Sequence, residues 1–177
     1  MAQEIEKKYL IRENGKDYAT FFLSKMFPSI QELKKDVAKN GKSIRQGYLS
    51  LDKGMELSDR LGINVDFAPS EARLRDKVGT LYFTLKGSGG LIRNELETNI
   101  EQEVFDEYWP KTEGKRVEKI RLNKPFEGYV AEIDVYGDRD LIVVEVEVPS
   151  LLDAEKLSPL GKDVTTDKKY KNKNLVR

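Results

Sequence analysis

Eight segments of this chain alternate charged and apolar residues, and no other feature limits its fold as strongly. Successive side chains of an extended backbone point to opposite faces, so such alternation predicts strands with one charged and one apolar face. In the first segment, Glu4, Glu6 and Lys8 share one face, and the residues between them share the other. The predicted strands cover residues 3–11, 44–51, 71–77, 80–86, 92–100, 115–122, 129–136 and 141–148.

Apolar residues at helix-like spacing predict helices between these strands. We expect helices over residues 17–27, 29–40 and 99–110, and a short helix after Ser150. Ser29 and Ser150 are each followed three residues later by an acidic residue, a capping-box pattern that begins a helix. The helices carry apolar stripes, and the apolar strand faces supply the surface that such stripes need.

Residues 52–70 are expected to form a loop with one short helical turn. Gly54, Gly62 and Pro69 lie in this segment, and each is a residue type that interrupts regular structure.

The charged strand faces are sorted by sign. For a single strand, a face exposed to water is the simpler interpretation, but a solvated surface mixes both signs. Eight antiparallel strands can close on themselves, which removes the sheet edges and leaves room for about one small ligand. We therefore predict an α+β fold, a closed eight-stranded antiparallel β-barrel (a tunnel) with a charged interior and flanking helices. It would form one domain over residues 1–177.

Composition narrows the chemistry. The chain has no cysteine and no histidine, which excludes disulfides, Ser-His catalysis and the usual zinc sites. Any metal would need oxygen ligands, which favours magnesium, manganese or calcium. The formal net charge is zero, so we expect no nucleic-acid partner. The N-terminus is polar and no segment approaches membrane length, so we expect a cytoplasmic protein with no membrane partner.

Acidic and basic residues occur in separate pairs. The acidic pairs are Glu4/Glu6, Glu95/Glu97, Glu132/Asp134 and Glu145/Glu147. The basic residues are Arg73/Arg75 and Lys119/Arg121, with Lys8, Lys86 and Arg93 placed singly. Carboxylates on converging strands suit a divalent cation, and Arg and Lys suit anionic oxygens. A phosphate chain with a bound metal fits both sets.

These motifs follow the order of the CYTH superfamily, the triphosphate tunnel metalloenzymes, which the chain resembles. Glu4-x-Glu6-x-Lys8 is followed by Arg73-x-Arg75, Thr84-Leu85-Lys86, Arg93-x-Glu95-x-Glu97, Lys119-x-Arg121, Glu132-x-Asp134 and Glu145-x-Glu147. Residues 44–49 (IRQGYL), 113–122 (EGKRVEKIRL) and 167–175 (DKKYKNKNL) look like short bacterial members that hydrolyse tripolyphosphate. Residues 13–42 and 52–70 look longer than the corresponding loops of those members, which leaves the substrate open.

The resemblance implies a role for each charged residue. The metal-binding carboxylates would be Glu4, Glu6, Asp134, Glu145 and Glu147, with Glu132 a weaker member. The phosphate-binding residues would be Lys8, Arg73, Arg75, Lys86, Lys119 and Arg121, with Lys168 or Lys169 closing one end. Arg93, Glu95 and Glu97 would line the wall and orient the basic residues. The catalytic candidates are Glu4, Glu6 and Lys8.

The implied function is hydrolysis of a small-molecule triphosphate with Mg²⁺ or Mn²⁺, inorganic tripolyphosphate giving pyrophosphate and phosphate. Without histidine, metal activation of water is the simplest source of a nucleophile, and Lys8 or Tyr48 could assist. An adenylate cyclase, or a nucleoside or thiamine triphosphatase, would use the same barrel. A non-catalytic polyphosphate-binding module would need the basic residues but not the carboxylates. The protein would act as a monomer or homodimer.

Overall fold

The computed structural model describes residues 2–177, which form long strands, two short strands and several helices. The long strands are β1 (Ala2–Glu13), β3 (Lys42–Leu49), β4 (Pro69–Lys77), β5 (Thr80–Gly87), β6 (Ile92–Asn99), β7 (Arg116–Phe126), β8 (Tyr129–Tyr136) and β9 (Leu141–Glu147). Two short strands, β2 (Lys16–Asp17) and β10 (Lys162–Asp163), pair with β1. The α-helices are α1 (Phe21–Ser24), α2 (Ile30–Asn40), α3 (Leu51–Arg60), α4 (Gln102–Tyr108) and α5 (Leu151–Lys156).

The strand pairing is cyclic. Hydrogen-bonded neighbours follow the order β1-β6-β5-β4-β3-β7-β8-β9, and β9 also pairs with β1. This is the strand order of a closed eight-stranded antiparallel β-barrel with flanking helices, which confirms the predicted α+β fold class. Within residues 2–177, no helix is long and apolar enough to cross a membrane.

Contacts divide the chain into two compact units, and each combines segments that are distant in sequence. Unit 1 contains the described residues up to Glu4, together with Ile44–Val117 and Asp167–Arg177. Unit 2 contains Ile5–Ser43 and Glu118–Thr166. The single domain expected over residues 1–177 stays a prediction.

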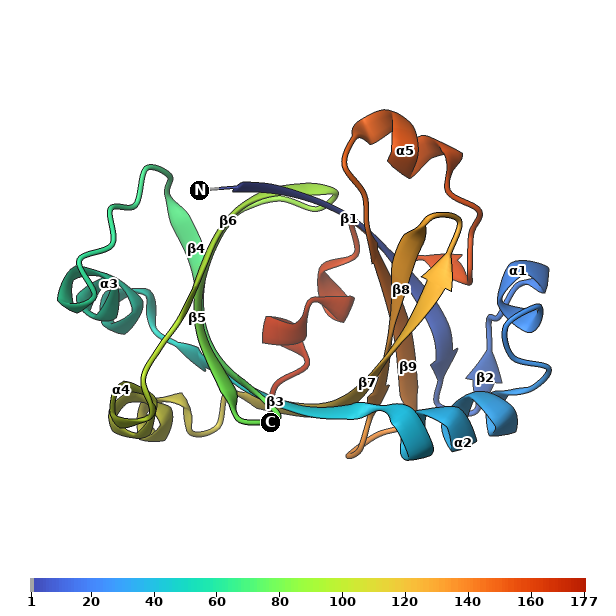
Figure 1. Ribbon diagram of the computed structural model, residues 1–177, viewed down its shortest axis with the longest axis horizontal. Coiled ribbons are helices and arrows are strands. Elements are labelled where there is room, and N and C mark those ends of the chain that lie inside the picture. The colour runs from blue at the N-terminus through green and yellow to red at the C-terminus, as the bar shows by residue number, and fades with distance from the viewer. Residues whose placement is uncertain (1) are drawn as a thin grey trace. The chain divides into compact units, whose positions relative to one another are not determined.

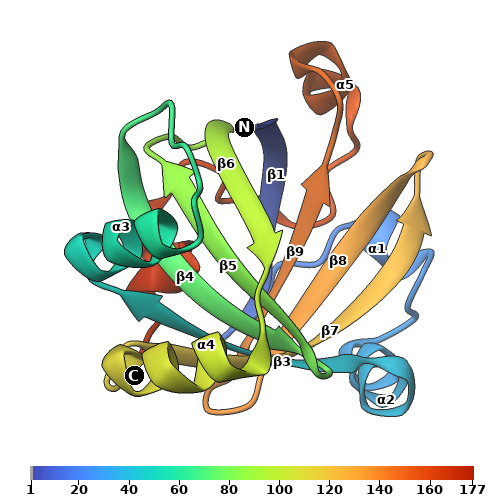
Figure 2. The ribbon, with the colours of Figure 1, turned by 60° about the vertical axis from the view of Figure 1, so that its left-hand side comes forward.

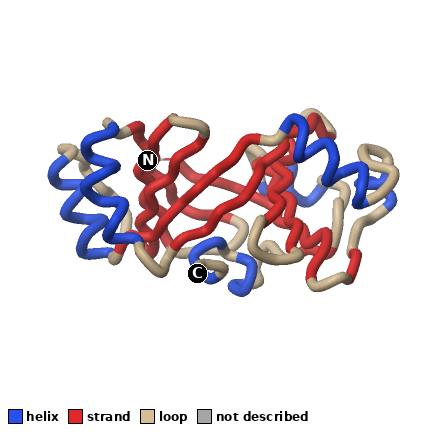
Figure 3. Tube along the Cα trace, turned by 90° about the horizontal axis from the view of Figure 1, so that it is seen from below, coloured by secondary structure: helices blue, strands red, loops and turns tan. Residues whose placement is uncertain are grey.

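Unit 1 has an apolar sheet face covered by two helices. Leu74 and Phe83, which are cross-strand partners on β4 and β5, are fully buried. They pack in one cluster with Leu57 of α3 and Phe105 of α4. Figures 1 and 2 show α3 and α4 against the same side of β4 and β5, and in Figure 3 they run beside each other. The helices therefore leave the opposite, charged face of this sheet uncovered.

The expectation of a loop over residues 52–70 is wrong for its first half, because α3 begins directly after β3. The Ser50 side chain caps this helix by accepting a hydrogen bond from the Lys53 backbone N–H. Gly54 lies inside the helix, where a Cβ would come 2.3 Å from Cβ of Ala72 on β4. This glycine therefore allows close packing of the helix on the strand and does not interrupt the helix.

Unit 2 is built on the ladder that joins β8, β9 and β1. Ile133, Val144 and Tyr9 form one buried cross-strand row on its apolar side. Helix α2 begins at the predicted position, with Ser29 accepting a hydrogen bond from the Glu32 N–H at 3.2 Å. Asp36 of α2 pairs with Lys124 of β7 at 2.7 Å, which attaches this helix to the strand.

The helix expected over residues 17–27 is much shorter than predicted. The chain forms β2 first, and only Phe21–Ser24 are α-helical. The buried residues are Leu23 and Phe27, whereas Phe21, part of the predicted apolar stripe, is 68% exposed. The short helix after Ser150 is confirmed as α5, and Ser150 accepts a hydrogen bond from the Asp153 N–H.

The C-terminal segment of unit 1 forms two 3-10 turns, η2 (Lys168–Tyr170) and η3 (Asn172–Asn174). It lies on the side of β4 and β5 opposite to α3 and α4 (Figure 1). Lys171 donates a hydrogen bond to the Gly89 carbonyl, and the Arg177 N–H donates to the Arg116 carbonyl. The segment is therefore attached to the connection between β5 and β6 and to the start of β7.

Candidate functional site

The charged face of unit 1 is ordered in cross-strand rows. Strand register places Tyr48 opposite Arg73, Arg73 opposite Thr84, and Thr84 opposite Glu97. The neighbouring row contains Glu71, Lys86 and Glu95. Register alone therefore brings basic and acidic residues from β4, β5 and β6, and Tyr48 from β3, together on one face.

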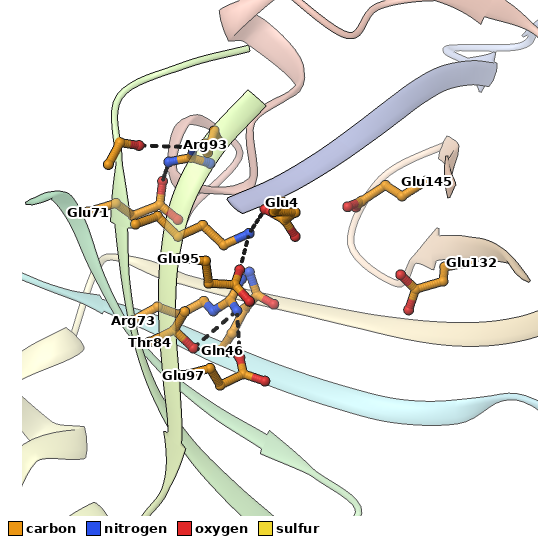
Figure 4. A network of polar contacts seen from close by, with 12 residues as sticks. Glu4, Gln46, Glu71, Arg73, Thr84, Arg93, Glu95, Glu97, Glu132 and Glu145 are labelled. Carbon is orange, nitrogen blue, oxygen red and sulfur yellow. Dashed lines mark hydrogen bonds and ion pairs between the residues drawn. The ribbon is translucent and has the colours of Figure 1, made fainter. Parts of the chain in front are cut away.

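Lys86 is held between two carboxylates. Its Nζ lies 2.8 Å from Glu4 Oε2 and 2.9 Å from Glu95 Oε2, and both glutamates are labelled in Figure 4. The three residues of this group come from three different strands: Glu4 from β1, Lys86 from β5 and Glu95 from β6. The two carboxylates thus fix the Lys86 Nζ in position.

Arg73 is held in a similar way by Thr84 and Glu97. Its Nη2 lies 3.3 Å from Thr84 Oγ1 and 3.4 Å from Glu97 Oε2, and the threonine hydroxyl donates to the same carboxylate at 2.8 Å (Figure 4). The side chain is buried, and among residues 2–177 its Nε finds no hydrogen-bond partner. A buried guanidinium N–H without an acceptor can donate to an anionic ligand.

The buried Glu71 pairs with the partly buried Arg93 at one end of this face. Arg93 Nη2 lies 3.0 Å from Glu71 Oε2, and its Nε donates to the Gly87 carbonyl at 3.0 Å. Burial opposes ionisation of Glu71, but the charges of Arg93 and Arg73 outweigh it and lower the pKa of this carboxyl. Glu71 is therefore a carboxylate at neutral pH.

Tyr48 brings a buried hydroxyl to the same face. Gln46 Nε2 donates a hydrogen bond to it at 2.8 Å. Burial, with a further contribution from the Glu71 carboxylate, raises the pKa of Tyr48 to about 12. At neutral pH this side chain keeps its proton and acts as a donor.

Unit 2 carries the second charged cluster, which is centred on Asp134. This carboxylate is 0% exposed and accepts bonds from Lys119 Nζ at 2.6 Å and from Arg121 Nε and Nη2 at 2.6 and 2.7 Å. Burial disfavours its charged form, but the Arg121 and Lys119 charges outweigh burial and lower the pKa of Asp134. Arg121 also donates to Glu132 at 2.6 Å.

Glu145 lies beside this group, between Lys8 and Glu132 in strand register. Its Oε1 lies 3.6 Å from Lys8 Nζ and 3.4 Å from Arg121 Nη2. Burial raises the pKa of Glu145, yet the charges of Lys8 and Arg121 hold this pKa well below its ordinary value. The carboxylate is therefore ionised over the whole physiological range.

The charged face of unit 2 has more carboxylates than bases. The acidic residues are Glu6, Glu132, Asp134, Glu145 and Glu147, and the basic residues are Lys8, Lys119 and Arg121. Five negative charges against three positive charges leave an excess of two negative charges. Over residues 2–177, however, no three acidic side chains are grouped as metal binding requires. The metal-ligand assignments stay predictions.

Most predicted site residues thus lie in one of these two clusters, and the tail lysines do not. Lys168 and Lys169 are exposed on η2, and Lys171 is the tail residue that contacts the β5–β6 connection. Sequence reasoning did not select Glu71 and Gln46 as site residues. Both could have been found from alternation, because Glu71 is in phase with Arg73, and Gln46 with Tyr48. The roles of all these residues toward a substrate stay predictions.

Comparisons with known proteins connect the chain to named enzymes. No protein-family model matches it. It is 41% identical over 140 residues to an inorganic triphosphatase of Nitrosomonas europaea, covering 75% of this chain and 83% of that protein. It is 32% identical over 184 aligned residues to an inorganic triphosphatase of Acetivibrio thermocellus, covering 100% of this chain and 95% of that protein.

Solved structures agree with these relatives. The crystal structure of an inorganic triphosphatase is 30% identical, covers 99% of this chain and 95% of its own, and gives a TM-score of 0.55. A putative adenylate cyclase from Bacillus halodurans is 16% identical with a TM-score of 0.50, over 88% of this chain and 86% of its own. At that identity the second likeness concerns the fold alone.

Proposed function

Because this chain belongs to the inorganic triphosphatase family, we propose that it hydrolyses inorganic tripolyphosphate to pyrophosphate and orthophosphate. The observation that carries the proposal is the set of buried basic side chains of unit 1, which neighbouring carboxylates hold in place. A phosphate chain supplies anionic oxygens that such donors bind strongly. We further propose that the protein acts in the cytoplasm as a monomer or homodimer.

Arg73, Arg75 and Lys86 are proposed to bind phosphate oxygens. Glu97 and Glu95 hold Arg73 and Lys86 in fixed positions before substrate arrives. Donors that are already oriented stabilise the charge that shifts between phosphate oxygens in the transition state, without a cost of reorientation during the reaction. Lys119 and Arg121 of unit 2 are proposed to bind phosphate oxygens as well, and Lys168 or Lys169 to close one end.

Proton transfer is assigned to Tyr48 and Lys8. With a pKa of about 12, Tyr48 holds its proton at neutral pH and can donate it, or a hydrogen bond, to a phosphate oxygen that gains charge. Lys8 lies 3.6 Å from Glu145, and this ion pair holds its Nζ near the site. Tyr48 therefore does not act as a base at neutral pH.

We also propose that the reaction requires Mg²⁺ or Mn²⁺. The chemistry of the donors supports this proposal, because unit 2 presents an excess of carboxylate oxygens, the ligand type that hard divalent cations prefer. The proposed ligands in unit 2 are Glu6, Asp134, Glu145 and Glu147, with Glu132 a weaker member, and Glu4 is proposed from unit 1. A bound divalent cation would supply a water of lowered pKa as the nucleophile. At Glu132, Asp134 and Glu145, the bonds from Arg121 compete with any cation.

The metal requirement can be tested by orthophosphate release from tripolyphosphate at increasing Mg²⁺ or Mn²⁺ concentrations. Glu145→Gln removes one proposed ligand charge, and Glu118→Gln, an exposed neighbour of Lys119 in sequence, is the matched control. We expect at least a tenfold rise in the metal concentration for half-maximal rate in Glu145→Gln, equivalent to about 1.4 kcal/mol, and no change in Glu118→Gln. A rate unaffected by chelator would contradict the metal requirement.

Substrate choice needs a separate comparison. ATP and thiamine triphosphate, tested under the same conditions, distinguish a tripolyphosphatase from the nucleoside or thiamine triphosphatase and adenylate cyclase alternatives. We expect tripolyphosphate to give the highest kcat/KM. If ATP gives pyrophosphate and a cyclic nucleotide while tripolyphosphate stays intact, the cyclase alternative is correct. Binding of polyphosphate without any cleavage would instead indicate a binding module.

A further inference from the structure

Gln46 is a fully buried polar residue on the charged face of unit 1. It is 0% exposed, and its cross-strand partner is Arg75. Its Nε2 donates to the hydroxyl oxygen of Tyr48, which is 6% exposed, at 2.8 Å. Its carbonyl oxygen Oε1 accepts no hydrogen bond from any residue between 2 and 177. A buried amide with one half unsatisfied is costly, so a gain elsewhere is expected to offset it.

The hydrogen bond from Gln46 determines where the Tyr48 hydroxyl hydrogen can point. A phenol O–H lies near the ring plane, and it therefore has two favoured directions. Because an N–H of Gln46 points at the oxygen from one side, a hydroxyl hydrogen on that side would meet another hydrogen. The hydroxyl hydrogen is therefore directed away from Gln46.

The charged groups around Tyr48 offer few acceptors for that hydrogen. The charged groups that influence its hydroxyl are Glu71, Arg73, Arg75 and Lys86. Three of the four are cations, which cannot accept a hydrogen bond. Glu71 already accepts from Arg93 at 3.0 Å. An anion bound to the basic side chains would bring acceptor oxygens to this hydroxyl.

We propose that Gln46 is a positioning residue that turns the Tyr48 O–H toward the phosphate chain bound on the basic face of unit 1. This inference rests on the proposed function and extends it to a residue that does not itself touch the substrate. The opposite arrangement would have Tyr48 donating to the Gln46 carbonyl oxygen. In that arrangement the Tyr48 hydroxyl donates its hydrogen bond to Gln46, and it donates no hydrogen bond to the phosphates.

Substitution by glutamate separates the two arrangements, because a carboxylate has nearly the shape of the amide but can only accept. If residue 46 must donate, Gln46→Glu draws the hydroxyl hydrogen toward itself and kcat falls. If residue 46 accepts from Tyr48, Gln46→Glu keeps that bond and kcat is maintained. Gln46→Met removes both hydrogen-bonding groups at similar volume.

The experiment is a double-mutant cycle on tripolyphosphate hydrolysis with Mg²⁺ or Mn²⁺. The variants are Gln46→Met, Gln46→Glu, Tyr48→Phe and the double variant Gln46→Met/Tyr48→Phe, each measured for kcat and KM. We expect Tyr48→Phe to lower kcat about 100-fold, the lower range for a lost proton donor. Gln46→Met should lower kcat about tenfold with KM changed less than twofold, and Gln46→Glu should lower kcat at least as much. In the Tyr48→Phe background, Gln46→Met should have no further effect.

A control separates positioning from loss of stability. Leu74→Val removes one methylene-sized group from the apolar face of β4, so it lowers the melting temperature without touching Tyr48. We expect its kcat to match the wild type. Thermal unfolding of every variant shows that each one is folded at the assay temperature.

The outcomes keep this inference distinct from the proposed function. If wild-type protein does not cleave tripolyphosphate, the proposed function is wrong. If it does, the positioning role is overturned by an active Gln46→Glu, by an unaltered kcat in Gln46→Met, by a fully active Tyr48→Phe, or by equal losses for Gln46→Met in both backgrounds.

Discussion

Replacing Asp134 with asparagine should destabilise the protein far more than the loss of an exposed charge. Asp134 is 0% exposed and is bonded by the buried Lys119 and Arg121 at 2.6–2.7 Å. Removing one partner of a buried ion pair leaves an uncompensated charge and costs about 3–5 kcal/mol. Arg121 keeps its bonds to Glu132 and Glu145, so we expect the free energy of unfolding to fall by about 3 kcal/mol, the lower end of this range.

The assay is urea unfolding of Asp134→Asn and wild type, followed by circular dichroism. Since about 1 kcal/mol shifts the melting temperature by roughly 2–4 °C in a chain of this size, thermal unfolding should show a drop of about 6–12 °C. Asp138→Asn is the matched control, because Asp138 pairs with Arg139 at the surface and such pairs contribute less than about 1 kcal/mol.

Added inorganic phosphate provides a second part of the same test. An anion can neutralise the charge that Asp134→Asn leaves on Lys119 and Arg121, so phosphate should restore more stability to this variant than to wild type. If Asp134→Asn lost no more stability than Asp138→Asn, the reasoning from the buried ion network would be refuted.

Three other outcomes are expected. The pKa of Asp134 is lowered in the folded protein, so the ionised carboxylate stabilises the fold above the unfolded-state pKa of about 3.9. This contribution is lost as the pH falls through the folded-state pKa. Urea midpoints measured below pH 4 should therefore fall less steeply for Asp134→Asn than for wild type. Gly47→Ala would place a Cβ 2.4 Å from Thr112 Oγ1, so its melting temperature should drop, and unchanged melting would contradict this packing. Ser29→Ala removes the cap on the Glu32 N–H and should cost about 1 kcal/mol in urea unfolding, whereas Ser29→Asp should keep most of the stability.

The strands could be predicted because alternation is a local property. Arg73 and Arg75 face one side of β4 and Leu74 the other, as the spacing alone requires. The cyclic strand pairing could be predicted because the chain has eight such strands, whose charged faces are sorted by the sign of the charge. The caps at Ser29 and Ser150 were also visible, since a cap and its partner lie within one helical turn.

The errors come from interactions between distant residues. Gly54 was interpreted as a helix breaker, yet it lies in α3. This helix position is a glycine because Ala72, 18 positions along the chain, leaves no space for a side chain there. Within residues 17–27, the aromatic spacing favoured a long helix. The chain instead buries Leu23 and Phe27 and leaves Phe21 in solvent, because β2 first pairs with β1.

The members of the site could be predicted better than their partners. Sequence spacing selected Lys86, Glu4 and Glu95 but could not show that one ammonium group lies between the two carboxylates. That arrangement depends on strand register across distant segments. Gln46 was missed for the same reason, since its role depends on the hydroxyl it contacts rather than on a charge of its own.

The most direct test of the central claim is ³¹P NMR of tripolyphosphate incubated with the wild-type protein and Mg²⁺ or Mn²⁺. We predict that the tripolyphosphate resonances are replaced by those of pyrophosphate and orthophosphate in equal molar amounts, and that Tyr48→Phe slows this conversion. Tripolyphosphate that stays intact with both metals, in a sample shown to be folded, would contradict the assignment of this chain as a tripolyphosphatase.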